Sequence, residues 1–187
     1  MFGNIALFTD RKQWVPAFFK RVFVWLLNGT SMSVIETVTT TLARRIPEED
    51  KSVLFQLKEQ GFPMMVLSCG TADLSEKVLQ EAGIKDCFQY FEGNRFRFVE
   101  NRIIGTEVRV PSPEYKVQLL TDEYGLEAHN VVAVGDGYTD IPLLDWAGTS
   151  VLITREANKA VRNTRFHTIS SITEIVNILN PSGRGTR

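Results

Sequence analysis

The stretch NVVAVGDGYTDIPLL, residues 130–144, joins a run of aliphatic residues to two aspartates, Asp136 and Asp140. The aliphatic run predicts a buried strand over 130–135, and the glycines on either side of Asp136 allow a sharp turn directly after it. A helix is expected from about Tyr138, so Asp140 follows Asp136 by one helical turn and can face the same space. Two such carboxylates repel unless a hard cation lies between them, so the turn predicts a Mg2+ site. The alternative is an ordinary strand-to-helix turn with a capping aspartate.

A second polar turn follows an earlier apolar run, PMMVLS, residues 63–68. Ser68 offers a hydroxyl, and the amides of Cys69 and Gly70 are expected to face outward where a helix begins, an arrangement that suits phosphate. Lys116, on a later predicted helix, can supply the positive charge that phosphate needs. Each feature has a simpler interpretation when taken alone: a helix N-cap for Ser68, and a solvated surface charge for Lys116.

The order of elements predicts where these turns lie. Strands and helices alternate from Gly61 onward, with continuous apolar strands rather than strands of alternating polarity. This pattern favours a Rossmann-like α/β fold, in which a parallel sheet is covered by helices on both faces. A hairpin or small meander is expected over 87–110, with turn residues at Gly93-Asn94 and Glu100-Asn101. Because ligands bind beyond the carboxyl ends of parallel strands, the two polar turns are expected to meet.

The first sixty residues are organised differently. The apolar stretch over 14–28 and the segment that follows it are helical in pattern and have no strand between them, so we expect a small helical cap over 14–47. The core domain then comprises residues 1–13 and 48–180. The last residues, 181–187, are expected to be disordered.

Composition excludes several classes of function. The chain has 187 residues and a formal net charge of −1, so no general attraction to nucleic acid or to an anionic membrane is expected. Its longest apolar segment is interrupted by Lys20 and Arg21 and is too short to span a bilayer. Two cysteines are too few for a disulfide framework. A cytoplasmic, soluble protein is expected.

Three segments together resemble the haloacid dehalogenase-like phosphohydrolase superfamily, and within it the phosphoserine phosphatase-like group. MMVLSCGT is similar to the second motif, whose hydroxyl residue would be Ser68. Lys116 resembles the third-motif lysine, and VVAVGDGYTD the fourth motif, whose acidic residues would be Asp136 and Asp140. The resemblance covers about residues 50–180. It implies a Mg2+-dependent phosphomonoesterase that acts on a small phosphorylated metabolite such as phosphoserine.

The first motif of that superfamily, D-x-D-G-T, is not found. In the alignment with IALFTDRKQW, Asp10 takes the nucleophile position and Lys12 the position of the general acid. Alternatively, Asp10 is a loop or capping residue. In a second alignment the place of the motif falls within MFGNIA, residues 1–6, or before Met1 in a longer protein. A chain without the two aspartates is expected to bind phosphate or a partner with hardly any turnover. In a truncated chain, the apolar N-terminal helices would be exposed and would favour a homodimer.

Overall fold

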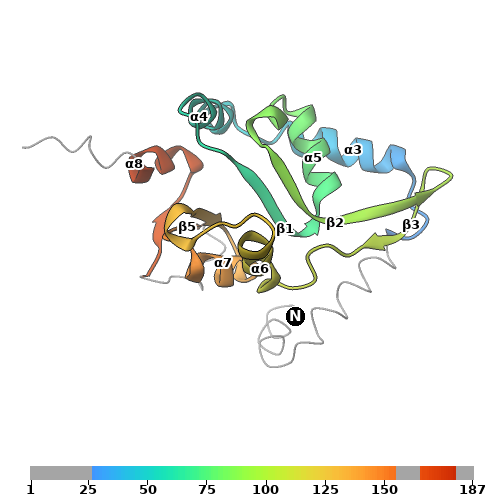
Figure 1. The fold of residues 1–187 in the computed structure, drawn as a ribbon. Coiled ribbons are helices and arrows are strands. Elements are labelled where there is room, and N and C mark those ends of the chain that lie inside the picture. The colour runs from blue at the N-terminus through green and yellow to red at the C-terminus, as the bar shows by residue number, and fades with distance from the viewer. Residues whose placement is uncertain (1–26, 155–164, 180–187) are drawn as a thin grey trace, which may run out of the picture.

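The computed structural model describes residues 27–154 and 165–179 (Figure 1). Its helices are α3 (Met32–Ala43), α4 (Glu48–Glu59), α5 (Ala72–Glu81), α6 (Tyr115–Asp122), α7 (Ile141–Trp146) and α8 (Ile175–Leu179). Its strands are β1 (Met65–Thr71), β2 (Tyr90–Val99), β3 (Arg102–Glu107), β4 (Val132–Gly135), β5 (Thr149–Ile153) and β6 (His167–Ile169). Short 3-10 helices are η1 (Lys85–Cys87), η2 (Ala128–Asn130), η3 (Tyr138–Asp140) and η5 (Ile172–Glu174). Asp10, residues 14–26 of the apolar stretch predicted to be helical, and the tail over 181–187 lie outside the described residues.

The predicted α/β fold with parallel strands is confirmed. β1 pairs with β2 in parallel, and β4, β5 and β6 form a second set of parallel strands. The described strands form two three-stranded sheets, β1-β2-β3 and β4-β5-β6, rather than the single sheet that the sequence predicted. Apolar runs identify strands but do not determine which strand lies next to which, and this explains the difference. β1 and β4 are each the first strand of their sheet.

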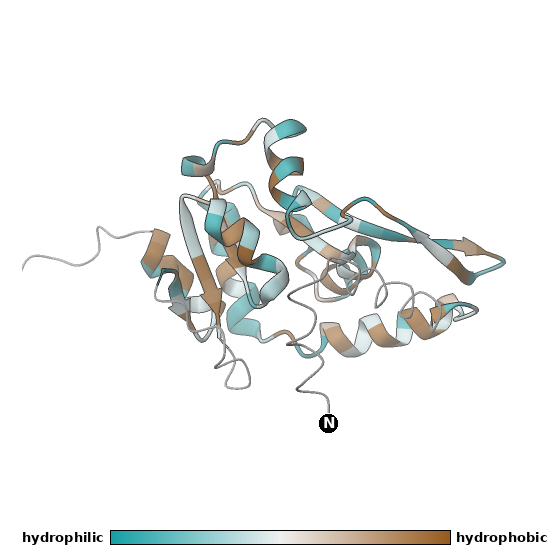
Figure 2. Ribbon diagram, turned by 90° about the horizontal axis from the view of Figure 1, so that it is seen from below, coloured by the Kyte–Doolittle hydropathy of each residue, from teal (hydrophilic) through white to brown (hydrophobic). Residues whose placement is uncertain are grey.

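The predicted hairpin is the long ribbon of β2 and β3, which projects from the body of the molecule (Figure 2). It turns at Glu100 and Asn101, whose φ angles of 48° and 61° are those of a tight two-residue turn that matches the strand twist. Gly93 and Asn94, the other predicted turn residues, lie inside β2 instead. The prediction of a turn there was wrong, because a Gly-Asn pair is also compatible with a strand interior that packs closely against a neighbour.

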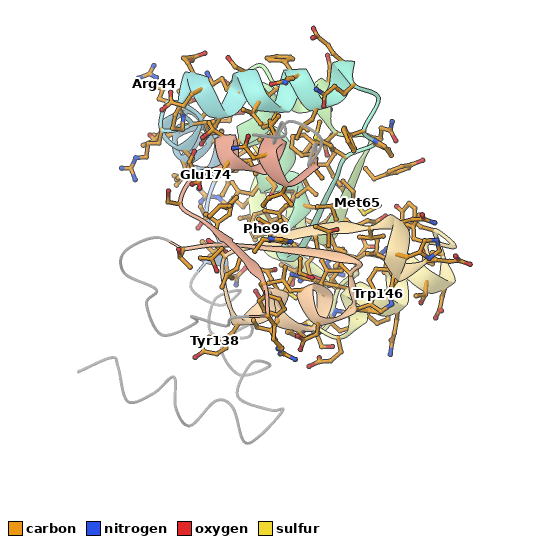
Figure 3. All side chains as sticks on the ribbon, turned by 90° about the vertical axis from the view of Figure 1, so that its left-hand side faces the viewer. Arg44, Met65, Phe96, Tyr138, Trp146 and Glu174 are labelled. Atoms are coloured by element: carbon orange, nitrogen blue, oxygen red, sulfur yellow. The ribbon has the colours of Figure 1, made fainter. Side chains whose placement is uncertain are left out.

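One apolar cluster connects the two sheets. Its buried members come from α6, β4, α7, β5 and the residue before β6, and Met65 and Leu67 of β1 pack against it. Figure 3 shows Met65 between the layer that contains α4 and the layer that contains Trp146. The first half of β1 therefore lies beside the same core as α6 and β4, and the predicted Ser68 turn follows directly after Leu67.

α3 covers the other side of the β1-β2-β3 sheet. Ile35 packs with Phe96 and Ile103 of the hairpin, and α3 lies beside α5 (Figure 1). The division into a core and a helical cap over 14–47 stays a prediction. None of the helices in the described ranges is long and apolar enough to cross a bilayer.

Candidate functional site

Lys116 is a buried cation. It lies in the first turn of α6 and its residue is 1% exposed, which excludes the interpretation of a solvated surface charge. Its Nζ atom donates a hydrogen bond to Oδ1 of Asp140 at 2.6 Å. A buried ammonium group is costly unless a charged partner accepts its hydrogen bonds. The structure therefore brings together two of the predicted site residues: Lys116 at the start of α6 and Asp140 in the turn after β4.

Asp140 organises the turn that carries it. Its Oδ2 atom accepts hydrogen bonds from the backbone N–H groups of Asp136, at 3.1 Å, and Gly137, at 3.3 Å. This close approach requires glycine at position 135, where an added Cβ atom would lie 2.4 Å from Cβ of Asp140. Asp140 thus receives three hydrogen bonds, one of them from an ammonium group.

The arrangement of the two aspartates determines how a metal ion could bind. Both oxygens of Asp140 accept hydrogen bonds, and Asp136 is the more exposed of the two residues. Within the described ranges, no group of three or more His, Cys, Asp or Glu residues is placed to hold a metal ion. Mg2+ commonly binds through one or two carboxylates and completes its shell with water and substrate phosphate oxygens. The residues present fit Mg2+ in that manner, with Asp136 as the more accessible ligand.

The SCGT turn begins inside β1 rather than after it. Ser68 is half-buried, and its Oγ accepts a hydrogen bond from the N–H of Gly70 at 2.9 Å. The helix α5 begins at Ala72 with Thr71 as its N-cap, so Ser68 is not the cap residue. A phosphate group at this turn would find the Ser68 hydroxyl, whose oxygen accepts the N–H of Gly70.

The structure relates this turn to Lys116 through the shared core. Leu67 precedes Ser68, and it packs against the cluster that contains Leu120, one helical turn after Lys116. The same cluster contains Ala133 of β4, just before the aspartate turn. The three predicted elements of the site therefore pack on one core cluster. The side chains of Lys116 and Asp140 are in direct contact.

A polar cluster on the hairpin was not predicted. Asn94, which is buried, donates from Nδ2 to the carbonyl of Cys69 at 2.8 Å and accepts at Oδ1 from the N–H of Arg109 at 2.9 Å. The Arg109 guanidinium lies between the carboxylates of Glu92 and Glu123, and its hydrogen bonds lower the pKa of Glu123. The sign of this cluster in the sequence was one asparagine within a segment that alternates apolar and polar residues. We interpreted the position of that asparagine as a turn.

Tyr124 extends this cluster and gives it a pH dependence. Burial, together with the hydrogen bond that its hydroxyl donates to Glu92 at 2.6 Å, raises the pKa of Tyr124 to about 12. An unfolded tyrosine ionises near pH 10. The contribution of the protonated Tyr124 to the stability of the folded state is therefore complete below pH 10 and is lost as the pH rises through 12. We expect the stability advantage of the wild type over Tyr124→Phe to shrink between pH 10 and pH 12.

Urea unfolding at a series of pH values measures this difference. Tyr138→Phe is the matched control, because Tyr138 is 64% exposed. A difference between wild type and Tyr124→Phe that stays constant up to pH 12 would contradict the role given to the Glu92 hydrogen bond.

Comparisons with known proteins bear on the family of the chain. A sequence model described as haloacid dehalogenase-like hydrolase matches residues 16–148. The chain is 27% identical over 132 residues to a phosphoserine phosphatase from Archaeoglobus fulgidus. This alignment covers 68% of this chain and 37% of that protein. It is 24% identical over 162 residues to a phosphoserine phosphatase from Streptococcus thermophilus, covering 84% of this chain and 73% of the other. The chain thus spans well under half the length of the first of these relatives.

Solved structures support the same fold. A hydrolase of the same superfamily from Salmonella enterica serovar Typhi superposes with a TM-score of 0.67 at 20% identity, over 89% of this chain and 55% of that one. A substrate-bound phosphoserine phosphatase superposes with a TM-score of 0.60 at 22% identity, over 84% of this chain and 73% of the other. At these identities the likeness shows the fold alone.

Proposed function

The chain belongs to the haloacid dehalogenase-like hydrolases, and from this premise we propose that it hydrolyses the phosphate monoester of a small metabolite in a Mg2+-dependent reaction. A phosphoserine-like compound is the proposed substrate class. The observation that carries the proposal is the buried Lys116 ammonium, held at 2.6 Å by Asp140 in the turn after β4. A buried cation near the carboxyl ends of parallel strands supports the binding of an anion at this edge of the sheet.

The proposed roles follow from the chemistry of each group. The Ser68 hydroxyl and the amide of Cys69 bind the phosphate oxygens, and the amide of Gly70 joins them when it exchanges its hydrogen bond to Ser68 for one to phosphate, because hydroxyl and N–H groups near a helix start donate to anions. Lys116 neutralises negative charge on the phosphate, and Asp140 holds the ammonium in place. Phosphoryl transfer depends mainly on such positioning and charge stabilisation. This division of roles makes Asp140 a positioning residue as well as a candidate metal ligand.

Asp136 is the proposed direct ligand of Mg2+, and Asp140 can share its carboxylate with the ion only by weakening its contact with Lys116. When bound, Mg2+ supplies positive charge that offsets the charge of the phosphate group. Asp136 carries a carboxylate at an exposed position of the turn, in keeping with an ion that retains several waters and also contacts the substrate.

Asp10 is the proposed nucleophile, because the alignment of IALFTDRKQW with the first motif gives it the sequence position of the carboxylate that attacks phosphorus in this superfamily. The competing proposal is that the chain binds phosphate without turnover. It is favoured by one observation: Lys12 stands where the second aspartate of the motif is expected. A lysine beside the metal would repel the cation, and it is a poor general acid for this purpose unless its pKa falls.

A phosphate-release assay with phosphoserine distinguishes the two proposals. We expect turnover with Mg2+, loss of turnover on chelation with EDTA, and a decrease by a factor of roughly a thousand or more in Asp10→Asn. Asp122→Asn, at the end of α6, is the control and should retain wild-type turnover. Tungstate binding without turnover would favour the binding protein, and neither binding nor turnover would refute both proposals.

A further inference from the structure

Asn94 connects the phosphate turn to the segment that precedes the lysine helix. Its side chain makes three hydrogen bonds, all to backbone groups. The Nδ2 atom donates to the carbonyl of Cys69 at 2.8 Å, and Oδ1 accepts from the N–H groups of Arg109, at 2.9 Å, and Val110, at 3.0 Å. Asn94 is 6% exposed, so these bonds form where water competes little. One planar carboxamide thus fixes two segments that are far apart in sequence.

Arg109 extends the connection to the other end of α6. Its Nε donates to Glu92 of β2 at 3.1 Å, and its two terminal nitrogens donate to the carboxylate of Glu123 at 2.8 and 2.5 Å. Glu123 is the C-cap residue of α6. The chain before α6 is therefore bound to β2 directly, the residue that ends α6 is bound to β2 through Arg109, and Lys116 lies between these two connections.

The strand β2 packs closely against the Ser68 turn, so the Asn94 side chain can reach the backbone of Cys69 directly. A Cβ atom added at Gly93 would lie 3.0 Å from the carbonyl oxygen of Ser68 and 3.1 Å from the backbone nitrogen of Ala72. β2 therefore contacts the turn in two ways. The backbone at Gly93 lies close to Ser68 and Ala72, and the side chain of Asn94 donates a hydrogen bond to the carbonyl of Cys69.

We propose that Asn94, supported by Arg109, is a positioning residue that sets the separation between the Ser68 turn and Lys116, so that both can bind one phosphate group. This inference rests on the proposed phosphate site. It assigns a role to a residue that contacts neither the phosphate nor the metal. The physical reason is that the carboxamide has both a donor and an acceptor face, so a single rigid group can hold a carbonyl and two amides at a defined spacing.

Asn94→Ser tests the proposal without adding charge, so that any loss of anion affinity cannot come from electrostatic repulsion. Binding of tungstate in the presence of Mg2+, measured by calorimetry, is expected to weaken about tenfold, since loss of a buried hydrogen bond of this kind commonly has that effect. Thr39→Val is the matched control. Thr39 is 2% exposed and donates one hydrogen bond to the carbonyl of Glu36, on α3, so its loss lowers stability without touching the turn.

Hydrogen exchange separates the failure of this inference from failure of the proposed function. In Asn94→Ser, we expect faster exchange of the amides of Gly70, Arg109 and Val110 than in wild type, and no such change in Thr39→Val. This comparison holds even for a protein that binds no tungstate. Wild-type affinity in Asn94→Ser, or unchanged exchange where tungstate does not bind, would overturn the proposal.

Arg109→Lys decides the question should Asn94→Ser fail to fold. Lysine retains the positive charge but cannot form the two-pronged contact with Glu123. We expect tungstate affinity to decrease about threefold, in keeping with a partly exposed ion pair, and the amides of residues 109 and 110 to exchange faster. Affinity and exchange equal to those of wild type would overturn the proposal.

Discussion

Replacing Lys116 with methionine is expected to abolish tungstate binding and phosphate release, and to lower the free energy of unfolding by about 3 kcal/mol. Methionine has a similar length but no charge, so the phosphate loses its cation and Asp140 loses the partner of its Oδ1 atom. The side chain of Asp140 is only 17% exposed, so water replaces that partner poorly. Urea unfolding and calorimetry measure the two effects.

Lys51→Met is the matched control for Lys116→Met. Lys51 also donates to a carboxylate at 2.6 Å, that of Glu48, but the glutamate side chain is 84% exposed. Such a surface pair contributes less than about 1 kcal/mol, so the control is expected to retain tungstate affinity and nearly all of its stability. Wild-type tungstate affinity in Lys116→Met would contradict the role of Lys116.

Replacing Gly135 with alanine is expected to have the second largest effect. The added Cβ atom would lie 2.4 Å from Cβ and 2.7 Å from Cγ of Asp140, so this side chain must move. The movement would break its contact with Lys116 and its hydrogen bonds to the turn amides. We expect a loss of about 2–3 kcal/mol in the free energy of unfolding, as in other overpacked sites, and a decrease in phosphate release of roughly a hundredfold.

Gly137→Ala, two residues further on, is the control for Gly135→Ala. Nothing lies within 4 Å of a Cβ atom at Gly137, and its φ of −150° suits any residue. We expect unfolding and phosphate release close to those of the wild type. Phosphate release in Gly135→Ala equal to that in Gly137→Ala would contradict the requirement for an exactly placed Asp140.

Several elements of the fold could be predicted because the sequence pattern alone determines them. Residues 132–135 of the strand predicted over 130–135 form β4, and the helix expected from Tyr138 begins as η3 and continues as α7. The predicted strand over 63–68 ends later than expected, at Thr71, because Thr71 pairs with Asn94 on β2. That extension depends on a partner strand, which no local pattern reveals.

The sequence suggested which residues form the candidate site, but it did not reveal the contacts between them. The spacing of Asp136 and Asp140 shows that both residues belong to one turn, and it led us to predict two metal ligands. It could not show that Lys116, from another helix, holds Asp140 at 2.6 Å. The hydrogen bonds of Asn94 were missed for a similar reason. Their three partners are backbone groups of residues 69, 109 and 110, and the sequence does not show which backbone groups a side chain will meet.

A crystal structure of the protein with Mg2+ and tungstate tests the proposed site most directly, because tungsten can be located by its anomalous scattering. We predict tungstate within hydrogen-bonding distance of both Ser68 Oγ and Lys116 Nζ, with Mg2+ on the carboxylate of Asp136. Tungstate bound to only one of these two groups, or a separation between Ser68 and Lys116 too large for one phosphate group to span, would contradict a shared site.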